Sequence, residues 1–182
     1  MANLLDKNDR AVRAFILDAV KSCGAGITIY IRNDSRDRAQ DNGGLVDVDT
    51  TAGPEAPVGS GCYMVNVMVR AKMPAATQPG QSDTDNHKLI GALTKAVHDR
   101  LHLTDNGQDY QATAAGITDA AYALAASDDP ARDPADADLA NYSCLAVVHN
   151  NLTGGKPQDE ASVSFVELIN FQCLVAGVGN LR

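Results

Sequence analysis

The sequence predicts a single α+β domain in which two helices and four strands are interrupted by two long polar loops. Apolar residues recur at helical spacing in two segments and alternate with polar residues in four others. The length of 182 residues suits one sizeable core, so residues 1–182 are interpreted as one domain. Apolar residues make up 45% of the chain, whereas aromatics make up 4%. Aliphatic side chains are therefore expected to fill the core.

The first helix is expected over about residues 3–22. Apolar residues there recur at spacings of three, four and seven, and Gly24 or Gly26 can end the helix; the apolar positions are Leu5, Val12, Phe15, Ile16 and Ala19. A half-buried strand is expected next, over residues 27–32, because three isoleucines alternate there with more polar neighbours.

The first long loop is expected over about residues 33–60. Its middle holds a short alternating piece, 45–49, which could form a projecting hairpin. Flanking residues such as Gly44 and Pro54 argue against a long central strand. The strand that follows, 61–73, is predicted more firmly, with one face turned to the helices; that face carries Tyr63, Val65, Val67, Val69, Ala71 and Met73.

The second helix is expected over about residues 83–103, with Asp83 or Thr84 as its cap. Its apolar stripe consists of Leu89, Ile90, Leu93, Val97 and Leu101. The second long loop should then run over about residues 104–141. An Ala-rich piece, 117–126, can form a short helix there, and 127–139 is interpreted as a solvated acidic connection.

The last third of the chain is predicted to be a β-hairpin. Residues 142–149 form one strand and 162–175 the other, with Gly154, Gly155 and Pro157 between them.

Composition argues against several classes of function. The formal net charge is −8, whereas proteins that bind nucleic acid by neutralising phosphates gather Lys and Arg on one face. No apolar run approaches the roughly 20 residues that span a bilayer, and the N-terminus has no apolar signal-peptide centre. We therefore expect no membrane partner and a cytoplasmic location. The cysteines are expected to be free thiols; they are Cys23, Cys62, Cys144 and Cys173.

Several short patterns resemble motifs for catalysis, cofactor binding or metal binding, but each lacks residues that the motif requires. The chain is therefore not expected to be an enzyme. His98 and His102 are four apart on the second predicted helix, but no H-E-x-x-H pattern accompanies them. We interpret them as surface histidines. Lys156 follows two glycines, but the pattern lacks other residues of a phosphate-binding loop. The many aspartates lack the spacing and terminal Glu of a calcium loop.

The two loops are the strongest functional signal that the residues themselves give. Connections beyond about 12 to 15 residues are uncommon in compact domains unless they carry function or need a partner to order them. We therefore expect an assembly subunit whose loops bury too little apolar surface to order alone. The candidate assembly residues in these loops are Asp47, Asp49, Asp128, Asp129 and Asp133.

The order of predicted elements resembles that of the tail terminator, or tail completion, proteins of long-tailed bacteriophages. Four stretches carry the resemblance: AVRAFI at 11–16, YMVNVMV at 63–69, HKLIGAL at 87–93 and SFVELINF at 164–171. The acidic stretch at 127–139 has no counterpart in this pattern.

The resemblance implies a mixed, mainly antiparallel four-stranded sheet with two helices packed on one face. It also implies a structural virion protein of the neck, assembled in the host cytoplasm as a homo-oligomeric ring, expected to be a hexamer. Such a ring caps the tail tube protein and docks to the head–tail connector protein, while DNA passes through its lumen without specific binding. One alternative is another neck or tail subunit, such as a head-completion or tail-tube protein. A second is a small cytosolic metal- or ligand-binding α+β protein.

Overall fold

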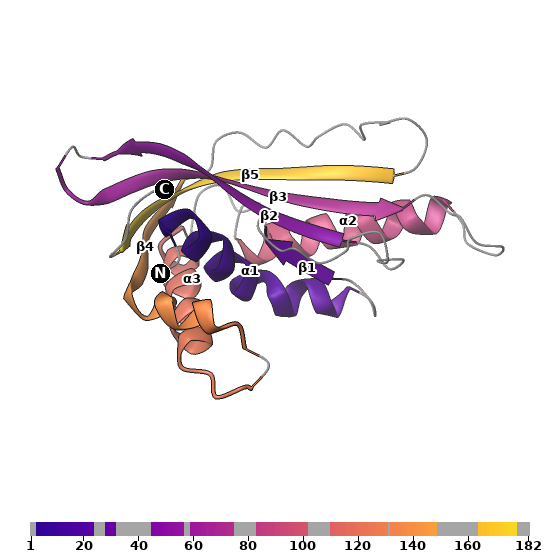
Figure 1. The fold of residues 1–182 in the computed structure, drawn as a ribbon. Coiled ribbons are helices and arrows are strands. Elements are labelled where there is room, and N and C mark those ends of the chain that lie inside the picture. The colour runs from indigo at the N-terminus through magenta and orange to yellow at the C-terminus, as the bar shows by residue number, and fades with distance from the viewer. Residues whose placement is uncertain are drawn as a thin grey trace.

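A computed structural model describes residues 3–23, 28–31, 45–56, 59–74, 83–101, 110–130, 132–148 and 164–177. Helices lie along one face of a twisted five-stranded sheet (Figure 1). The elements, in chain order, are α1 (Leu4–Ser22), β1 (Thr28–Ile31), β2 (Leu45–Glu55), β3 (Cys62–Pro74), α2 (Asp83–Arg100), α3 (Tyr110–Ala125), the 3₁₀ helix η2 (Pro134–Asn141), β4 (Tyr142–Val148) and β5 (Ser164–Gly177).

Helix α1 confirms the first predicted helix. The side chain of Asn3 caps it by accepting a hydrogen bond from the Asp6 N–H at 2.8 Å, which satisfies one of the N–H groups left free at a helix start. The buried face of α1 contains Leu4, Val12, Phe15, Ile16 and Val20. Burial of this stripe against the sheet is what stabilises the helix.

The sheet confirms the predicted fold class. The strand order is β1-β2-β3-β5-β4, in which β1 runs parallel to β2 and every other pair is antiparallel. The period-two alternation of β3 sets its faces: Val65, Val67 and Val69 are buried, whereas Asn66 is exposed. The domain is therefore α+β with a mixed, mainly antiparallel sheet, and it has five strands rather than the four predicted.

Strand β2 is the additional strand, and the prediction that residues 33–60 form one long loop is wrong where the structure describes them. Val46 and Val48 are fully buried, and β2 lies between β1 and β3. Gly53 and Pro54 do not break the strand, because they lie at its end, where the pairing with β3 shifts register between Ala52 and Glu55. A Cβ at Gly53 would lie 2.2 Å from the Met64 carbonyl oxygen, so glycine permits this close approach. The projecting hairpin expected at 45–49 is not formed there, because these residues pair with β3 along the buried part of β2.

The second predicted loop, 104–141, is also wrong where it is described, because it contains α3 and η2. Helix α3 has 16 residues rather than a short piece at 117–126, and it buries Ile117 and Ala121. Its small side chains let it lie close to α1: a Cβ at Gly116 would lie 2.4 Å from the Phe15 ring. In η2, Leu139 is fully buried, so the stretch 127–139 is not merely a solvated connection.

The remaining predicted elements are confirmed. Helix α2 buries Ile90, Leu93 and Val97, and β4 pairs with β5 as an antiparallel hairpin. One residue of α2 differs from expectation: His98 is 8% exposed, not a surface histidine. It is buried because α2 packs against α1 as well as against β3 and β5. The glycines and proline at 154–157 and His102 lie outside the described residues.

All four cysteines are free thiols in the structure. Cys144 and Cys173 are buried on the paired strands β4 and β5. A hydrogen bond with Cys144, together with burial, raises the pKa of Cys173 well above its usual value.

We therefore predict that Cys144 and Cys173 resist alkylation by iodoacetamide in the folded protein, because only the thiolate is reactive and both groups are shielded. Mass spectrometry should find both modified only after denaturation, and with no native disulfide. Rapid alkylation of both thiols in the folded protein would contradict the burial of Cys144 and Cys173.

Candidate assembly surface

The predicted assembly residues Asp47 and Asp49 lie in β2 rather than in a loop. Thr50 of the same strand faces α1, so the alternation of the strand places Asp47 and Asp49 on the opposite face of the sheet. Asp47 is 8% exposed and stands opposite Arg70 in the register of β2 with β3. Cross-strand pairs of opposite charge stabilise a sheet, which gives Asp47 a structural role of its own.

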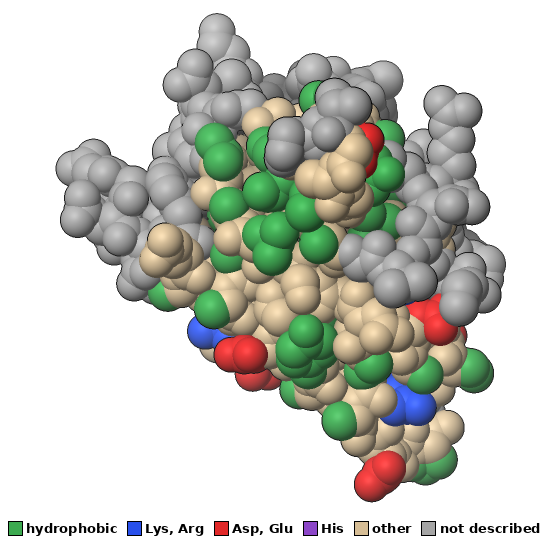
Figure 2. Space-filling model, turned by 90° about the vertical axis from the view of Figure 1, so that its left-hand side faces the viewer, with side chains coloured by type: hydrophobic (Ala, Val, Ile, Leu, Met, Phe, Trp, Pro, Cys, Tyr) green, Lys and Arg blue, Asp and Glu red, His purple; other side chains and the backbone are tan. Residues whose placement is uncertain are grey.

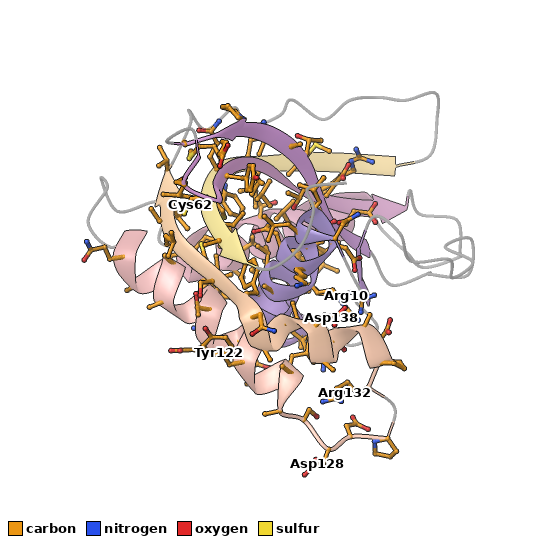
Figure 3. The ribbon with its side chains drawn as sticks, turned by 60° about the vertical axis from the view of Figure 1, so that its left-hand side comes forward. Arg10, Cys62, Tyr122, Asp128, Arg132 and Asp138 are labelled. Carbon is orange, nitrogen blue, oxygen red and sulfur yellow. The ribbon has the colours of Figure 1, made fainter. Side chains whose placement is uncertain are left out.

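Asp128 and Asp129 are exposed in the connection that follows α3. This connection is tied to the helix by Arg132, whose Nη1 donates to the carbonyl oxygens of Ala125 and Ser127, both at 2.7 Å. Figure 3 shows Arg132 close to the end of α3, with Asp128 pointing away from the domain. Asp128 and Asp129 therefore lie on the surface of the domain.

Asp133 belongs to an ion cluster around Arg10 of α1. Arg10 contacts carboxylate oxygens of Asp6 at 3.1 Å, Asp133 at 3.0 Å and Asp136 at 2.8 Å. Asp133 also caps η2 by accepting from the Ala135 N–H at 2.9 Å. That backbone bond, together with Arg10, lowers the pKa of Asp133 below its ordinary value. The five predicted aspartates thus occupy three separate places and do not form one site.

The large exposed hydrophobic side chains of the described residues all lie on α3 and β4. They are Tyr122 at 43%, Leu145 at 50% and Val148 at 42% exposure. We name these three residues the β4–α3 surface. Figure 2 shows hydrophobic side chains gathered over this end of the molecule, with charged side chains mainly towards its lower part and margins. Clustering of this kind marks a contact surface more often than single exposed apolar residues do.

Local structure explains why these side chains point outwards. Leu145 lies at the irregularity where the pairing of β4 with β5 shifts between Cys144 and Ala146, and such a bulge turns a side chain away from its regular direction. Tyr122 lies beside the start of β4, with its hydroxyl 3.3 Å from Ser143 Oγ. An open hollow of about 300 Å³ adjoins it, lined by Tyr122, Ala125, Ala126 and Ala140.

A second hollow lies on the sheet face that α1 does not cover. Its volume is about 340 Å³, and its polar lining includes Asp49, Thr51, Asn66, Asn170 and Gln172. The Gln172 amide donates to Asn66 Oδ1 at 2.7 Å across β3 and β5. This hollow is therefore lined by amide and hydroxyl side chains together with Asp49, whereas the β4–α3 surface is formed by Tyr122, Leu145 and Val148.

Among the described residues, no group of three His, Cys, Asp or Glu side chains lies close enough to hold a metal ion. The same residues include no helix with the length and apolar character to cross a membrane.

The β4–α3 surface is not among the sites that the sequence predicts. A signal was present, because residues 145–148 are all apolar, although an edge strand usually alternates. Tyr122 gave no such signal, since its neighbourhood depends on how α3 packs against β4.

No family model matches this sequence, and no curated protein matches it.

Proposed function

We propose that this chain is a structural subunit of a virion neck that resembles a phage tail terminator. In this proposal, identical subunits form a ring, expected to be a hexamer, that caps the tail tube and joins it to the head–tail connector. The mixed sheet with helices on one face supports it, because the resemblance implies such a sheet, although the structure adds strand β2, helix α3 and η2 to the implied elements.

The β4–α3 surface is the observation that carries the proposal. Tyr122, Leu145 and Val148 are each more than two-fifths exposed, although burial of such side chains is favourable by roughly 1.5 to 3 kcal/mol each. A subunit that meets its neighbour through this surface would gain the part of that energy that belongs to the area still exposed. Closed rings need contacts between two different surfaces of the same chain, and this surface can supply one of them.

Charge supports a conduit for DNA. The formal net charge of −8 opposes lasting contact with phosphate groups, which favours passage over retention. The hollow around Asn66 and Gln172 has no Lys or Arg among its lining residues and includes Asp49, which agrees with this reading.

The alternatives make different predictions. A head-completion or tail-tube protein would use the same surface with other partners, so binding to purified tail tubes separates these roles. A metal- or ligand-binding protein would use the flank of His98 or the loop carboxylates. Stoichiometric zinc or calcium in the purified protein would favour that alternative, but burial of His98 weakens its case.

Replacement of Leu145 by Glu tests the proposed role directly. An ionised carboxylate in an apolar contact costs several kcal/mol, so L145E should weaken ring formation by roughly 100-fold. Ala92→Glu is the matched control, because Ala92 is exposed on α2, away from this surface. Light scattering after gel filtration measures the oligomer, and electron microscopy shows its shape.

We expect wild type and A92E to form rings that bind tail tubes, and L145E to remain monomeric and folded. A wild-type protein that is monomeric and does not bind tail tubes would refute the neck role. Equal assembly by L145E and wild type would exclude Leu145 from the contact.

A further inference from the structure

Strand β4 lies at an edge of the sheet, where free backbone groups can recruit another strand. In the described part of the chain, β5 is the strand that pairs with it. Two N–H groups of β4 nevertheless point away from β5 and have acceptors elsewhere in the chain. The Tyr142 N–H donates to the Leu139 carbonyl at the end of η2, and the Cys144 N–H donates to Thr118 Oγ1 of α3 at 2.9 Å.

Thr118 can satisfy both backbone groups of Cys144. Its hydroxyl oxygen accepts from the Cys144 N–H and also lies 3.3 Å from the Cys144 carbonyl oxygen. The same hydroxyl lies 3.1 Å from the Ala114 carbonyl oxygen, one turn earlier in α3. A hydroxyl has one proton and two lone pairs, so one carbonyl receives its proton while the Cys144 N–H remains bound.

The next residue, Leu145, interrupts the strand with a bulge before the pairing resumes at Ala146. Bulges and covering elements are two ways in which proteins prevent edge strands from pairing with other copies. Protection is needed here, because the exposed Leu145 and Val148 would make an open β4 edge attractive to a second copy of itself.

We propose that Thr118 is an edge guard that prevents β4 from pairing with β4 of a second copy of this chain. The Thr118 hydroxyl binds the Cys144 N–H and lies 3.3 Å from the Cys144 carbonyl oxygen, so it covers the backbone groups that an incoming strand would use. Copies can then meet through side chains, but they do not extend the sheet. This inference does not depend on the role in a virion, since it concerns only how the free edge of β4 is kept from pairing with another strand.

The test replaces Thr118 by Val, which keeps the branched shape and removes the hydroxyl. Thr118→Ser keeps the hydroxyl and should behave as wild type. Thr113→Val is the matched control, because Thr113 lies on the same helix and donates to the Leu101 carbonyl at 3.1 Å, away from β4. Light scattering follows association, and infrared spectroscopy detects sheets formed between molecules.

We expect T118V alone to form concentration-dependent assemblies with an intermolecular sheet signal. The Cys144 amide should also exchange its hydrogen about tenfold faster in the remaining monomers, because it has lost its acceptor. Equal association of T118V and T113V would overturn the proposal.

A measurement on the wild-type protein covers the case in which T118V does not fold. The Cys144 amide should be protected from exchange although it points away from β5. Exchange as fast as that of an unprotected surface amide would overturn the proposal without any variant.

Discussion

Replacement of Arg10 by Met should lower the free energy of unfolding by about 3 kcal/mol, which corresponds to a fall of roughly 10 °C in Tm for a chain of this size. The side chains of Arg10 and Asp136 are 12% and 7% exposed, so the substitution leaves the Asp136 carboxylate in a dry site without its cation. Breaking a buried pair in this way costs more than the pair contributes to stability.

The Arg10 cluster also joins distant parts of the chain. Residues 10 and 136 are 126 positions apart, and their contact holds η2 against α1. Burial opposes the charge of Arg10, but the hydrogen bond with Asp136 and the charges of Asp6 and Asp133 outweigh it, so the pKa of Arg10 is raised above its ordinary value. Arg10 therefore stays charged throughout the pH range in which the protein is studied.

Chemical denaturation of R10M, with two comparison variants, measures this effect. Arg132→Met removes a guanidinium that binds backbone carbonyls and should cost less. Adding Asp136→Leu to R10M should restore part of the loss, because two apolar side chains then replace the ion pair. If the double variant is as unstable as R10M, the buried charge is not the cause.

The cluster also sets the direction of the pH dependence. The pKa of Asp133 is lowered in the folded state, chiefly by the Ala135 N–H and further by Arg10. A lowered pKa adds stability that is fully present above the ordinary value of about 4 and is lost as the pH falls through the folded value. Wild type should therefore lose more stability than R10M on acidification below about pH 4.

The sequence predicted those elements whose stability depends on a periodic apolar face. Helices α1 and α2 and strand β3 show such faces, and the structure confirms them. The sequence does not predict strand β2, because a proline such as Pro54 favours a break in a strand, whereas in the structure it lies after the buried residues Val46 and Val48. The position of a proline within a strand decides whether it interrupts the pairing, and the sequence alone does not give that position.

Helix α3 was underestimated for a different reason. Its alanines favour helix but form no distinct apolar stripe, so pattern alone did not reveal its length. Its packing depends on long-range fit, such as Gly116 against the Phe15 ring. The exposure of Tyr122 and Leu145 depends on this packing and on the register of β4, so the apolar run at 145–148 does not by itself predict the assembly surface.

Asn8 of α1 gives the second large expected effect, because it links two strands within the core. Its amide nitrogen donates to Thr50 Oγ1 of β2 at 2.8 Å, and its amide oxygen accepts from the Tyr142 hydroxyl of β4 at 2.8 Å. Asn8 and Tyr142 are fully buried, and Thr50 is 1% exposed. Asn8→Ala would leave two buried hydroxyl groups without this partner and would open a small cavity. Each such group costs about 1 to 3 kcal/mol, so we expect a total loss of about 3 kcal/mol.

Asn66→Ala is the matched control for this prediction. The Asn66 side chain accepts a hydrogen bond of similar length, 2.7 Å, from Gln172, but Asn66 is exposed. Water can replace the lost partner there, so N66A should cost less than about 1 kcal/mol. A second comparison combines Asn8→Leu with T50V and Y142F, which removes every polar group of the chain of hydrogen bonds and should be far milder than N8A. Equal losses in N8A and N66A would show that burial of the Asn8 amide does not set the cost, because the two variants remove amides of the same chemistry and differ mainly in their access to water.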